Sequence, residues 1–464
     1  NVHILDAFTG TGTFIVNLIR DTELMPAEKL AHKYMHEIHC NEIMLLAYYI
    51  ATINIEHAYH DRMGGENYQA FPGAVLTDTF QMYEEGDPVD RGMFIQNTVR
   101  GLEQMSLPIH VLVGNPPWSA KQASANDNNA NESYPTLDRR IAETYAAKTN
   151  ATNKNALYDS YIRAFRWASD RIGEKGIVSF VTNGGWLRTD SANGFRKCLV
   201  EEFNSIYVFD LRGNQRTQGE QSRKEGGKIF GSGSRAPVVI TMLVKNPNST
   251  DKGMIRYHDV GDYLKREEKL SIVGSSITDE IFEWKQLCPD KYGDWLEQRD
   301  DSWYDFIPIG IENKIKKEPN GLFGCFSRGL ETGRDDWIYG FSGCRVEKNM
   351  QSMINYYNQC REQQFDKEQK YNGQKIKWTS SLEIKYKNNE KILFKEGSLN
   401  RALYRPFCKE FLYWDEQIIH RPGIWKKCFP DKLKNMVMLL PGKTSRIFSC
   451  LVTNMLPDLN NMNG

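Results

Sequence analysis

The sequence lacks several features that would place it at once in a familiar class of protein. Its 464 residues contain no run of about 18 apolar residues and no charged-then-apolar leader, so neither a membrane-spanning helix nor a secretory signal is predicted. Net charge is also absent, because 59 Lys and Arg balance 59 Asp and Glu. Any surface that binds nucleic acid must therefore come from local basic clusters. These absences predict a soluble, cytoplasmic protein.

Paired cysteines are missing as well. The nine cysteines are scattered, odd in number, and form no C-x-x-C pair. This pattern argues against a zinc site and against a disulfide framework. We therefore expect reduced cysteines, as in cytoplasmic proteins, and no bound metal.

The first half of the sequence alternates strand patterns with helical patterns. Seven short apolar runs predict strands at 2–6, 36–40, 74–77, 109–114, 176–182, 205–211 and 237–245. Apolar residues at helical spacing predict helices at 13–20, 42–55 and 156–172. Such alternation is typical of an α/β fold in which helices cover both faces of a mostly parallel sheet. We predict a doubly wound, seven-stranded, Rossmann-like sheet.

A polar segment, NPNSTDKG at 246–253, interrupts this alternation and predicts a domain boundary. We place the first domain at 1–248 and the second at 249–464. The second is richer in Trp, Tyr and Lys, and its short strand patterns predict a mixed α+β domain. A strand pattern begins directly after Asn1, and the last residues follow an apolar segment. We therefore expect a piece of a longer polypeptide with a truncated second domain.

The opening segment ILDAFTGTGTF combines a strand, a glycine loop and the start of a helix. Gly10 and Gly12 permit positive φ and a close approach of ligand to backbone, while Asp6 stands at the carboxyl end of the strand. The spacing is not G-x-G-x-x-G, and no Lys follows as in a phosphate-binding loop. A carboxylate before the glycines suits an ammonium-bearing ligand better than a pyrophosphate, although an ordinary strand-to-helix turn is the alternative.

Two more acids follow the next two predicted strands. Glu42 in HCNEI suits the two ribose hydroxyls of a nucleoside, or else it is an acid favoured at a helix N-terminus. Asp78 in LTDTF suits an adenine amino group, or else it is a cap or turn residue. Each acid ends a successive strand, so we expect Asp6, Glu42 and Asp78 along one edge of the sheet.

The fourth predicted strand ends in an unusual segment, VLVGNPPWSA. Two prolines fix two φ angles and remove two N–H donors, which holds Asn115 and the Pro116 carbonyl in a rigid arrangement. Two such acceptors can bind one exocyclic amine and direct its lone pair at an electrophile, without a strong base. Pro117 stiffens the segment, and Trp118 offers a face on which a planar base can stack. A proline-stiffened loop with a buried Trp is the alternative.

DAFTGTGTF followed by NPPW resembles the amino-methylating DNA methyltransferases, which use S-adenosylmethionine to modify adenine N6 or cytosine N4. The order of the two motifs is similar to that of the gamma class, which methylates adenine. The resemblance implies that Asp6 binds the methionine ammonium, Glu42 the ribose and Asp78 the cofactor adenine. It also implies that the cofactor is wrapped by Phe8, Thr9, Gly10, Thr11, Gly12 and Thr13.

Later segments resemble a narrower family, the single-polypeptide Type I-like (Type ISP) restriction-modification enzymes. They include GIVSFVTNGGWL, FDLRGN, LETGRDDWIYGF and YRPFCKEFLYWD. The resemblance implies a target-recognition domain after the methyltransferase domain and a helicase-like motor and nuclease upstream of Asn1. It also places Phe230 of KIFGSG where an aromatic ring stacks on a flipped base; an ordinary buried Phe is the alternative. The family's cofactor motif before the first strand is absent here.

Basic residues cluster where contact with double-stranded DNA is expected. The glycine-rich stretch 211–237 carries Arg212, Arg216, Arg223 and Lys224, and predicts a phosphate-contacting loop beside the pocket, or else a solvated surface loop. In the second half, Arg328, Arg334 and Arg405 lie among polar groups that can contact base edges.

These observations lead to one hypothesis: site-specific methylation of adenine N6 in DNA, with base flipping, inside a larger restriction-modification polypeptide. Cytosine C5 chemistry is disfavoured because it needs a Cys nucleophile, and no Pro-Cys dipeptide occurs. Cytosine N4, RNA and a protein glutamine stay open as substrates of the same Asn-Pro-Pro element. A DNA-recognition module without catalysis is the alternative outside the enzymes.

Overall fold

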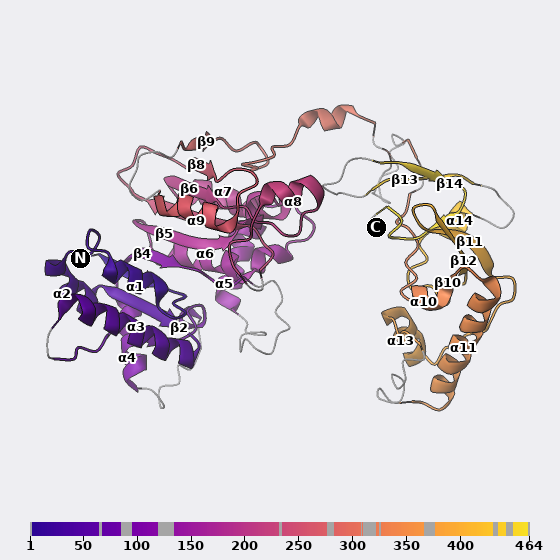
Figure 1. Cartoon of the computed structure of the whole chain (residues 1–464), viewed down its shortest axis with the longest axis horizontal. Helices are drawn as coiled ribbons and strands as arrows, with labels where there is room; N and C mark the ends of the chain where they lie inside the picture. Colours follow the sequence, from indigo (N-terminus) through magenta and orange to yellow (C-terminus); the bar gives the residue numbers. More distant parts are fainter. Residues whose placement is uncertain are drawn as a thin grey trace. The chain divides into compact units, whose positions relative to one another are not determined.

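The computed structural model divides the chain into two compact units, Asn1–Asp300 and Asp301–Gly464 (Figure 1). The residues that it describes are 2–64, 67–84, 95–118, 134–231, 234–275, 283–307, 309, 322–323, 326–365, 376–429, 435–441 and 449–462.

A mixed sheet of nine described strands forms the centre of the first unit. Its strands are β1 (His3–Asp6), β2 (Ile38–Glu42), β3 (Ala74–Leu76), β4 (Ile109–Gly114), β5 (Gly176–Asn183), β6 (Ser205–Asp210), β7 (Val238–Lys245), β8 (Met254–Asp259) and β9 (Lys285–Leu287). The order across the sheet is β3-β2-β1-β4-β5-β7-β6-β8-β9. β7 runs antiparallel to β5 and β6, β9 runs antiparallel to β8, and the other neighbours are parallel.

Helices cover both faces of this sheet. They are α1 (Thr13–Arg20), α2 (Ala27–His36), α3 (Leu45–Met63), α4 (Ile95–Ser106), α5 (Pro135–Ile141), α6 (Ser160–Arg171), α7 (Asn193–Glu202), α8 (Gly219–Glu225) and α9 (Arg266–Ser275). Ile4 of β1 packs with the core formed by α1, α2 and α3, whereas the next residue, Leu5, packs with α5, α6 and α7. Successive side chains of a strand point to opposite faces, so the two helix layers lie on opposite sides. The predicted doubly wound α/β fold is confirmed.

The compact unit ends later than the boundary predicted after residue 248. β8 pairs in parallel with β6 from Ser205↔Met254 to Asp210↔Asp259, and β9 pairs with β8. The polar segment 246–253 is therefore a turn inside the sheet, and the first unit continues to Asp300. The composition marks a break in the strand–helix alternation, but the hydrogen bonds of the next strand decide to which unit the chain belongs.

The second unit has a small mixed sheet packed against a long helix. Its elements are α10 (Asp335–Ile338), β10 (Tyr339–Gly340), α11 (Gly343–Glu362), α13 (Ser380–Lys387), β11 (Leu399–Arg405), β12 (Cys408–Tyr413), α14 (Trp425–Cys428), β13 (Val437–Leu439), β14 (Leu451–Thr453) and β15 (Leu456–Pro457). The main sheet has the order β10-β12-β11-β15, and β13 pairs with β14. Met350, Met353 and Tyr357 recur at helical spacing on α11 and are buried in the same core as Leu412 of β12. The predicted mixed α+β domain is confirmed.

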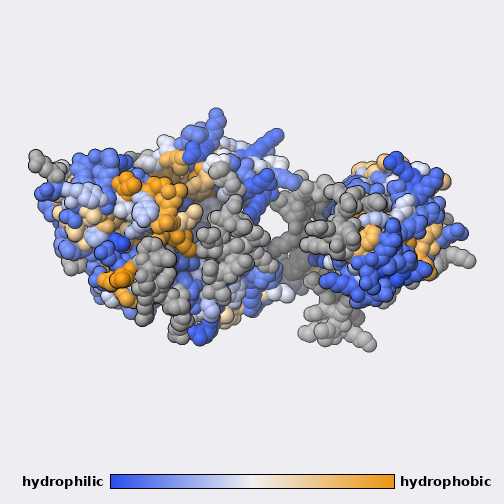
Figure 2. Space-filling model, turned by 90° about the horizontal axis from the view of Figure 1, so that it is seen from below, coloured by the Kyte–Doolittle hydropathy of each residue, from blue (hydrophilic) through white to orange (hydrophobic). Residues whose placement is uncertain are grey.

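Apolar side chains gather on part of the surface of the first unit (Figure 2). Exposed apolar residues of α3 include Leu45, Leu46, Tyr49 and Ile53. Among the residues that the structure describes, no helix is long and apolar enough to cross a bilayer.

Candidate active site

The candidate site lies at the carboxyl edge of the parallel strands. Asp6 and Glu42 are the last residues of β1 and β2, Asp78 follows β3 by two residues, and Asn115 follows β4 directly. Because β3, β2, β1 and β4 are adjacent and parallel, all four residues stand at one edge, as the sequence predicts. Ligands of open α/β sheets bind at this edge.

Asp6 is fully buried, and one of its carboxylate oxygens has no hydrogen-bond partner among the described residues. Its Oδ1 accepts a hydrogen bond from the backbone N–H of Phe8 at 3.2 Å, and its buried Oδ2 accepts none from any described residue. Loss of hydration raises the pKa of Asp6 to about 7, and the nearby Glu42 adds to this. A buried carboxylate oxygen without a partner is costly, and a cationic ligand would satisfy it.

The glycine loop is shaped by two close approaches. Gly10 has φ +57°, and its N–H donates to Glu42 Oε2 at 2.8 Å. Gly12 has φ +88°, and a Cβ there would lie 3.3 Å from Cα of Ala51 in α3. The Thr9 hydroxyl donates to the Asp6 carbonyl at 3.0 Å, whereas Thr11 and Thr13 are exposed at the start of α1. The loop is thus fixed from both sides and leaves its outer face open.

Phe8 takes a different position from the other loop residues. Its ring packs among the rings of Phe80, Trp167 and Phe180, with centroids 5.5, 6.3 and 6.1 Å away. Its N–H is the group that bonds Asp6. Phe8 therefore anchors the loop to the core beneath the sheet edge.

Glu42 and Asp78 already have protein partners. The two oxygens of Glu42 accept from the N–H groups of Gly10 and Met44, each at 2.8 Å. Asp78 Oδ1 accepts from Phe80 N–H at 2.9 Å, at the start of a 3-10 turn (Gln81–Tyr83), and its Oδ2 accepts from the Tyr134 hydroxyl at 2.8 Å. Asp78 Oδ1 also accepts from Gln81 N–H at 3.4 Å. The other three oxygens each accept one of these bonds and have a second lone pair, so both groups are oriented and can still accept from a ligand.

Asn115 to Trp118 form one wall of a pocket of about 430 Å³. The pocket is lined by Asn115, Pro116, Pro117, Trp118, Phe230, Gly231 and Ser234. Asn115 is exposed, Pro116 is buried, and Trp118 is half-buried against the core. Its indole ring meets the ring of Phe230 edge to face, with centroids 5.4 Å apart. The structure thus brings Phe230 to the Asn-Pro-Pro-Trp segment.

The antiparallel strand β7 explains why Phe230 can reach this pocket. Asp210, the last residue of β6, pairs with Val239, and Asn183 at the end of β5 pairs with Val238. The connection between β6 and β7 therefore begins and ends at the same sheet edge as Asn115. Phe230 lies in this connection.

The basic residues of the same connection differ in their surroundings. Arg216 and Arg223 are exposed, and Arg223 lies 3.3 Å from Glu220. Lys224 is partly exposed and 3.7 Å from Asp262. Arg212 is bound at Nε to Asp259 at 2.7 Å and pairs with Asp262 through Nη1, so it holds its own loop instead of presenting a free guanidinium.

The three arginines singled out in the second half also diverge. Arg328 is exposed. Arg405 is half-buried, pairs with Asp458 at 2.5 Å and stacks on Tyr404, with its guanidinium carbon 4.0 Å from the ring centroid. Arg334 is fully buried, where Nη1 donates to the Ile418 carbonyl and Nη2 to the Thr379 hydroxyl. The prediction that Arg334 contacts DNA is therefore wrong, because its charge is enclosed by the second unit.

Some residues of the site were not predicted. Tyr134 orients Asp78, and no sequence pattern connects two residues so far apart. Gly114 faces Asp6: a Cβ at position 114 would lie 3.3 Å from Asp6 Oδ1 and 3.4 Å from the Phe8 ring. A glycine just before the Asn-Pro-Pro element was the available signal. Gly231 and Ser234 line the pocket from within the glycine-rich stretch.

Two protein-family models match parts of the chain. The Eco57I restriction-modification methylase family matches residues 46–216, and the Type ISP C-terminal specificity domain matches residues 321–464.

Three solved structures resemble the chain over nearly all of its length. A nuclease-deletion mutant of the Type ISP restriction-modification enzyme LlaGI, in complex with a DNA substrate mimic, is 38% identical with a TM-score of 0.83; the match covers 99% of this chain and 38% of that one. The ATP-dependent Type ISP enzyme LlaBIII bound to DNA is 38% identical with a TM-score of 0.80 and coverages of 99% and 30%. DrdV in complex with DNA is 34% identical with a TM-score of 0.80 and coverages of 100% and 45%. The chain thus spans less than half of each of these proteins.

The fold, the site and these matches define a methylase of the restriction-modification class, followed by a specificity domain. Within that class, the chain belongs to the Type ISP restriction-modification family.

Proposed function

We propose that this chain transfers a methyl group from S-adenosylmethionine to N6 of an adenine flipped out of duplex DNA. One observation supports the proposal most strongly: the proline-stiffened segment from Asn115 to Trp118 and Phe230 line a single pocket. This pocket lies at the carboxyl edge of the sheet, and Asp6 stands at the same edge. The Type ISP relatives were solved with DNA, which supports DNA as the substrate.

The cofactor residues fit S-adenosylmethionine because their carboxylates are hydrogen-bond acceptors, which suit its ammonium, hydroxyl and amine donors. Asp6 has a buried oxygen without a partner for an ammonium group, and the loop from Phe8 to Thr13 is fixed around it. Glu42 and Asp78, oriented by backbone N–H groups and Tyr134, would accept the ribose hydroxyls and the cofactor's adenine amine. When bound, the cofactor supplies an electrophilic methyl group on a sulfonium.

The pocket residues would prepare the target amine. Asn115 Oδ1 and the Pro116 carbonyl would accept its two N–H bonds, which localises the nitrogen lone pair and points it away from both acceptors. The prolines hold these acceptors in place before the base arrives, so no reorganisation is needed at the moment of transfer. Trp118 and Phe230 would stack on the base and replace the neighbours that it loses from the duplex.

The second unit would select the target sequence. Its match to a specificity domain supports this role, with Arg328 and Arg405 as its candidate DNA contacts. In the first unit, Arg216, Arg223 and Lys224 would contact phosphates beside the pocket. The longer relatives lead us to propose that a motor and a nuclease accompany this chain in one polypeptide, and we assign neither activity to the chain itself.

Tritium transfer from labelled S-adenosylmethionine to unmethylated plasmid DNA tests the proposal. Asn115→Ala should abolish labelling while cofactor binding, measured by equilibrium dialysis, stays unchanged. Asn248→Ala, at an exposed asparagine in the turn after β7, is the matched control and should label like wild type. Equal labelling by wild type and Asn115→Ala would refute the catalytic assignment. Digestion to nucleosides should yield N6-methyladenine, whereas N4-methylcytosine would assign the same pocket to cytosine.

A further inference from the structure

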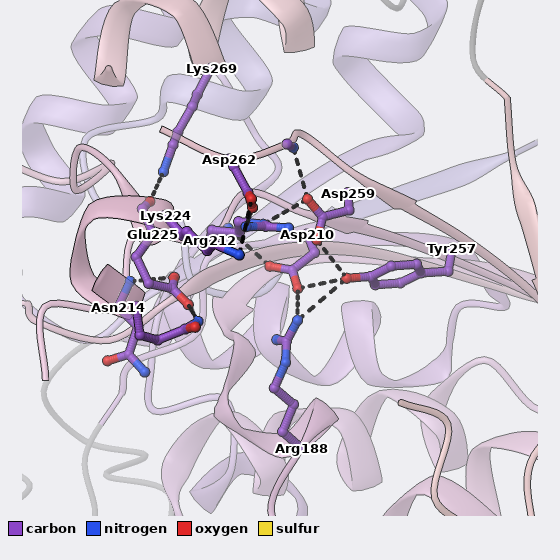
Figure 3. A network of polar contacts seen from close by, with 12 residues as sticks. Arg188, Asp210, Arg212, Asn214, Lys224, Glu225, Tyr257, Asp259, Asp262 and Lys269 are labelled. Carbon is purple, nitrogen blue, oxygen red and sulfur yellow. Dashed lines mark hydrogen bonds and ion pairs between the residues drawn. The ribbon is translucent and has the colours of Figure 1, made fainter. Parts of the chain in front are cut away.

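Helix α9 holds the segment of chain that leads into Phe230. Lys269 of α9 is fully buried, and its ammonium group donates to the carbonyls of Glu225 at 2.7 Å and Gly227 at 2.9 Å. Figure 3 shows Lys269 reaching down to the segment that carries Glu225. Burial lowers the pKa of Lys269 because its charged form loses hydration. A buried ammonium is tolerated when hydrogen bonds replace water, and here two backbone carbonyls provide them.

Arg266 continues this pattern one turn earlier in α9. Its Nε donates to the carbonyl of Ile229 at 2.7 Å, while the rest of its guanidinium is partly exposed. The carbonyls of Glu225, Gly227 and Ile229 therefore all accept hydrogen bonds from cations of α9. Phe230 is the next residue.

The two segments also approach each other through their backbones. Gly227 N–H donates to the carbonyl of Leu264 at 2.9 Å. A Cβ at Gly226 would lie 2.2 Å from the Leu264 carbonyl oxygen, and one at Gly227 would lie 2.7 Å from Arg266 N. Both distances are too short for any side chain, so this packing depends on the two glycines. It fixes the chain just before Phe230 at a close distance from α9.

An ion-pair cluster holds the base of this arrangement (Figure 3). Buried Asp210, at the end of β6, accepts from Arg188 at 3.0 Å and from the Tyr257 hydroxyl at 3.0 Å. Arg212 bridges from the start of the connection to Asp259, the last residue of β8. The cluster ties β6 to β8, and β8 leads into α9.

Apolar side chains of α9 also pack near Phe230. Ile272 and Val273 of α9 pack in the cluster of side chains that also includes Trp118 and Phe230. α9 thus supports the pocket in two ways, through its apolar side chains and through its two cations.

We propose that Lys269 and Arg266 are positioning residues for the flipped base: they bind the carbonyls before Phe230 and thereby hold its ring against Trp118 in the pocket. This inference rests on the proposed methyl transfer. Neither Lys269 nor Arg266 is among the residues that line the pocket. Their effect is on the distance and angle between Phe230 and Trp118, on which base stacking depends.

The experiment uses a DNA duplex with 2-aminopurine at the target position, since its fluorescence rises when the base leaves the stack. Single-molecule sequencing of plasmid DNA methylated by the wild-type protein first identifies the target sequence. Lys269→Met removes the charge and keeps a side chain of similar length. Arg266→Gln, at an exposed residue, removes the hydrogen bond to the Ile229 carbonyl. Both substitutions should reduce the rise in fluorescence, and both should reduce kcat. For Lys269→Met we expect kcat to fall by up to about 100-fold, which is the rate loss typical of a substrate displaced by about 1 Å.

Three measurements separate positioning from general damage. KM for S-adenosylmethionine should stay unchanged, because Asp6 and the glycine loop are not altered. Lys269→Arg, which keeps two donors and the charge, should restore part of the fluorescence rise. Lys265→Met, at an exposed lysine just before α9, is the matched control and should behave like wild type.

The outcomes are distinct. If the wild type methylates DNA but both variants keep its fluorescence rise and kcat, the positioning role is refuted and the proposed function stands. If the wild type transfers no methyl group, the proposed function is refuted and this inference with it. Should Lys269→Met fail to fold, as judged by thermal unfolding, the exposed Arg266→Gln decides the question.

Discussion

The indole ring of Trp118 and the phenyl ring of Phe230 meet edge to face, with 5.4 Å between centroids and 69° between planes. Trp118 lies four residues after the end of β4, and Phe230 lies in the connection between β6 and β7. Edge-to-face contact is a favourable arrangement of two aromatic rings. It leaves both rings on the wall of one pocket, where a planar base can contact them.

Replacing Phe230 by Ala should lower kcat/KM for DNA methylation. Stacking of a base on an aromatic ring contributes about 1–3 kcal/mol, so we expect a loss of roughly 5- to 150-fold. Phe230→Tyr keeps the ring and should retain activity within a small factor. Tritium transfer at several DNA concentrations gives the ratio. Full activity of Phe230→Ala would mean that Trp118 alone supports the base.

Cofactor affinity should rise with pH through the neutral range. The pKa of Asp6 is raised to about 7 by burial, and only the ionised carboxylate attracts an ammonium group. We therefore expect the dissociation constant for S-adenosylmethionine to fall from pH 5.5 to about 7.5 and then to level off. Asp6→Asn should bind weakly with a flat profile, as isothermal titration calorimetry would show. A sloping profile in Asp6→Asn would assign the titration to another group.

The same raised pKa makes a prediction for stability without cofactor. The folded protein binds the Asp6 proton more tightly than the unfolded chain, whose pKa is 3.8, so Asp6 destabilises the fold progressively as pH rises from 3.8 to about 7. The free energy of unfolding of Asp6→Asn should exceed that of wild type by more at pH 8 than at pH 5. Urea unfolding at the two pH values measures the difference. An equal difference at both would contradict the raised pKa.

Substitution of two arginines in the connection between β6 and β7 should affect two different properties, DNA binding and stability. Arg216 is exposed, so Arg216→Ala should weaken DNA binding and reduce the salt dependence of log Kd by about one ion, with unchanged thermal stability. Arg212 pairs with Asp259 and Asp262, so the main effect of Arg212→Ala should be a lower melting temperature. Fluorescence anisotropy across a salt series and thermal unfolding distinguish them. A stable Arg212→Ala variant with an altered salt slope would return Arg212 to the DNA interface.

Arg334→Ala should destabilise the second unit. Its guanidinium is enclosed and bonds the Ile418 carbonyl and the Thr379 hydroxyl, so truncation leaves a cavity and removes two hydrogen bonds, at a cost of about 2–5 kcal/mol. Arg328→Ala, at an exposed site in the same unit, is the control and should leave stability unchanged. Calorimetry measures both. A stable Arg334→Ala variant would contradict a structural role.

Local patterns allowed much of the first unit to be predicted. The seven predicted strands coincide with β1 to β7 to within two residues at each end, and α1 spans the predicted residues 13–20. Strand and helix periodicities are set by near neighbours in the chain, which the sequence displays directly. The carboxyl-edge placement of Asp6, Glu42, Asp78 and Asn115 follows from the parallel order of those strands.

Contacts between distant parts of the chain could not be predicted in the same way. The domain boundary was misplaced because β8 forms hydrogen bonds with β6, some 50 residues earlier. Arg334 was predicted to contact DNA because polar residues surround it in the sequence, but its partner Ile418 is 84 positions away. The role of α9 was missed for the same reason, since no sequence pattern links Lys269 to Gly227.

Gly114 has a consequence for the evolution and engineering of this site. It lies between Asp6 and Asn115, and a methyl group at its Cα would press on both the Asp6 carboxylate and the Phe8 ring. The Cα of Gly114 thus packs closely against the residue proposed to bind the cofactor ammonium, and it directly precedes the residue proposed to bind the target amine. We therefore expect a side chain at position 114 to perturb the Asp6 carboxylate and the Asn115 segment together.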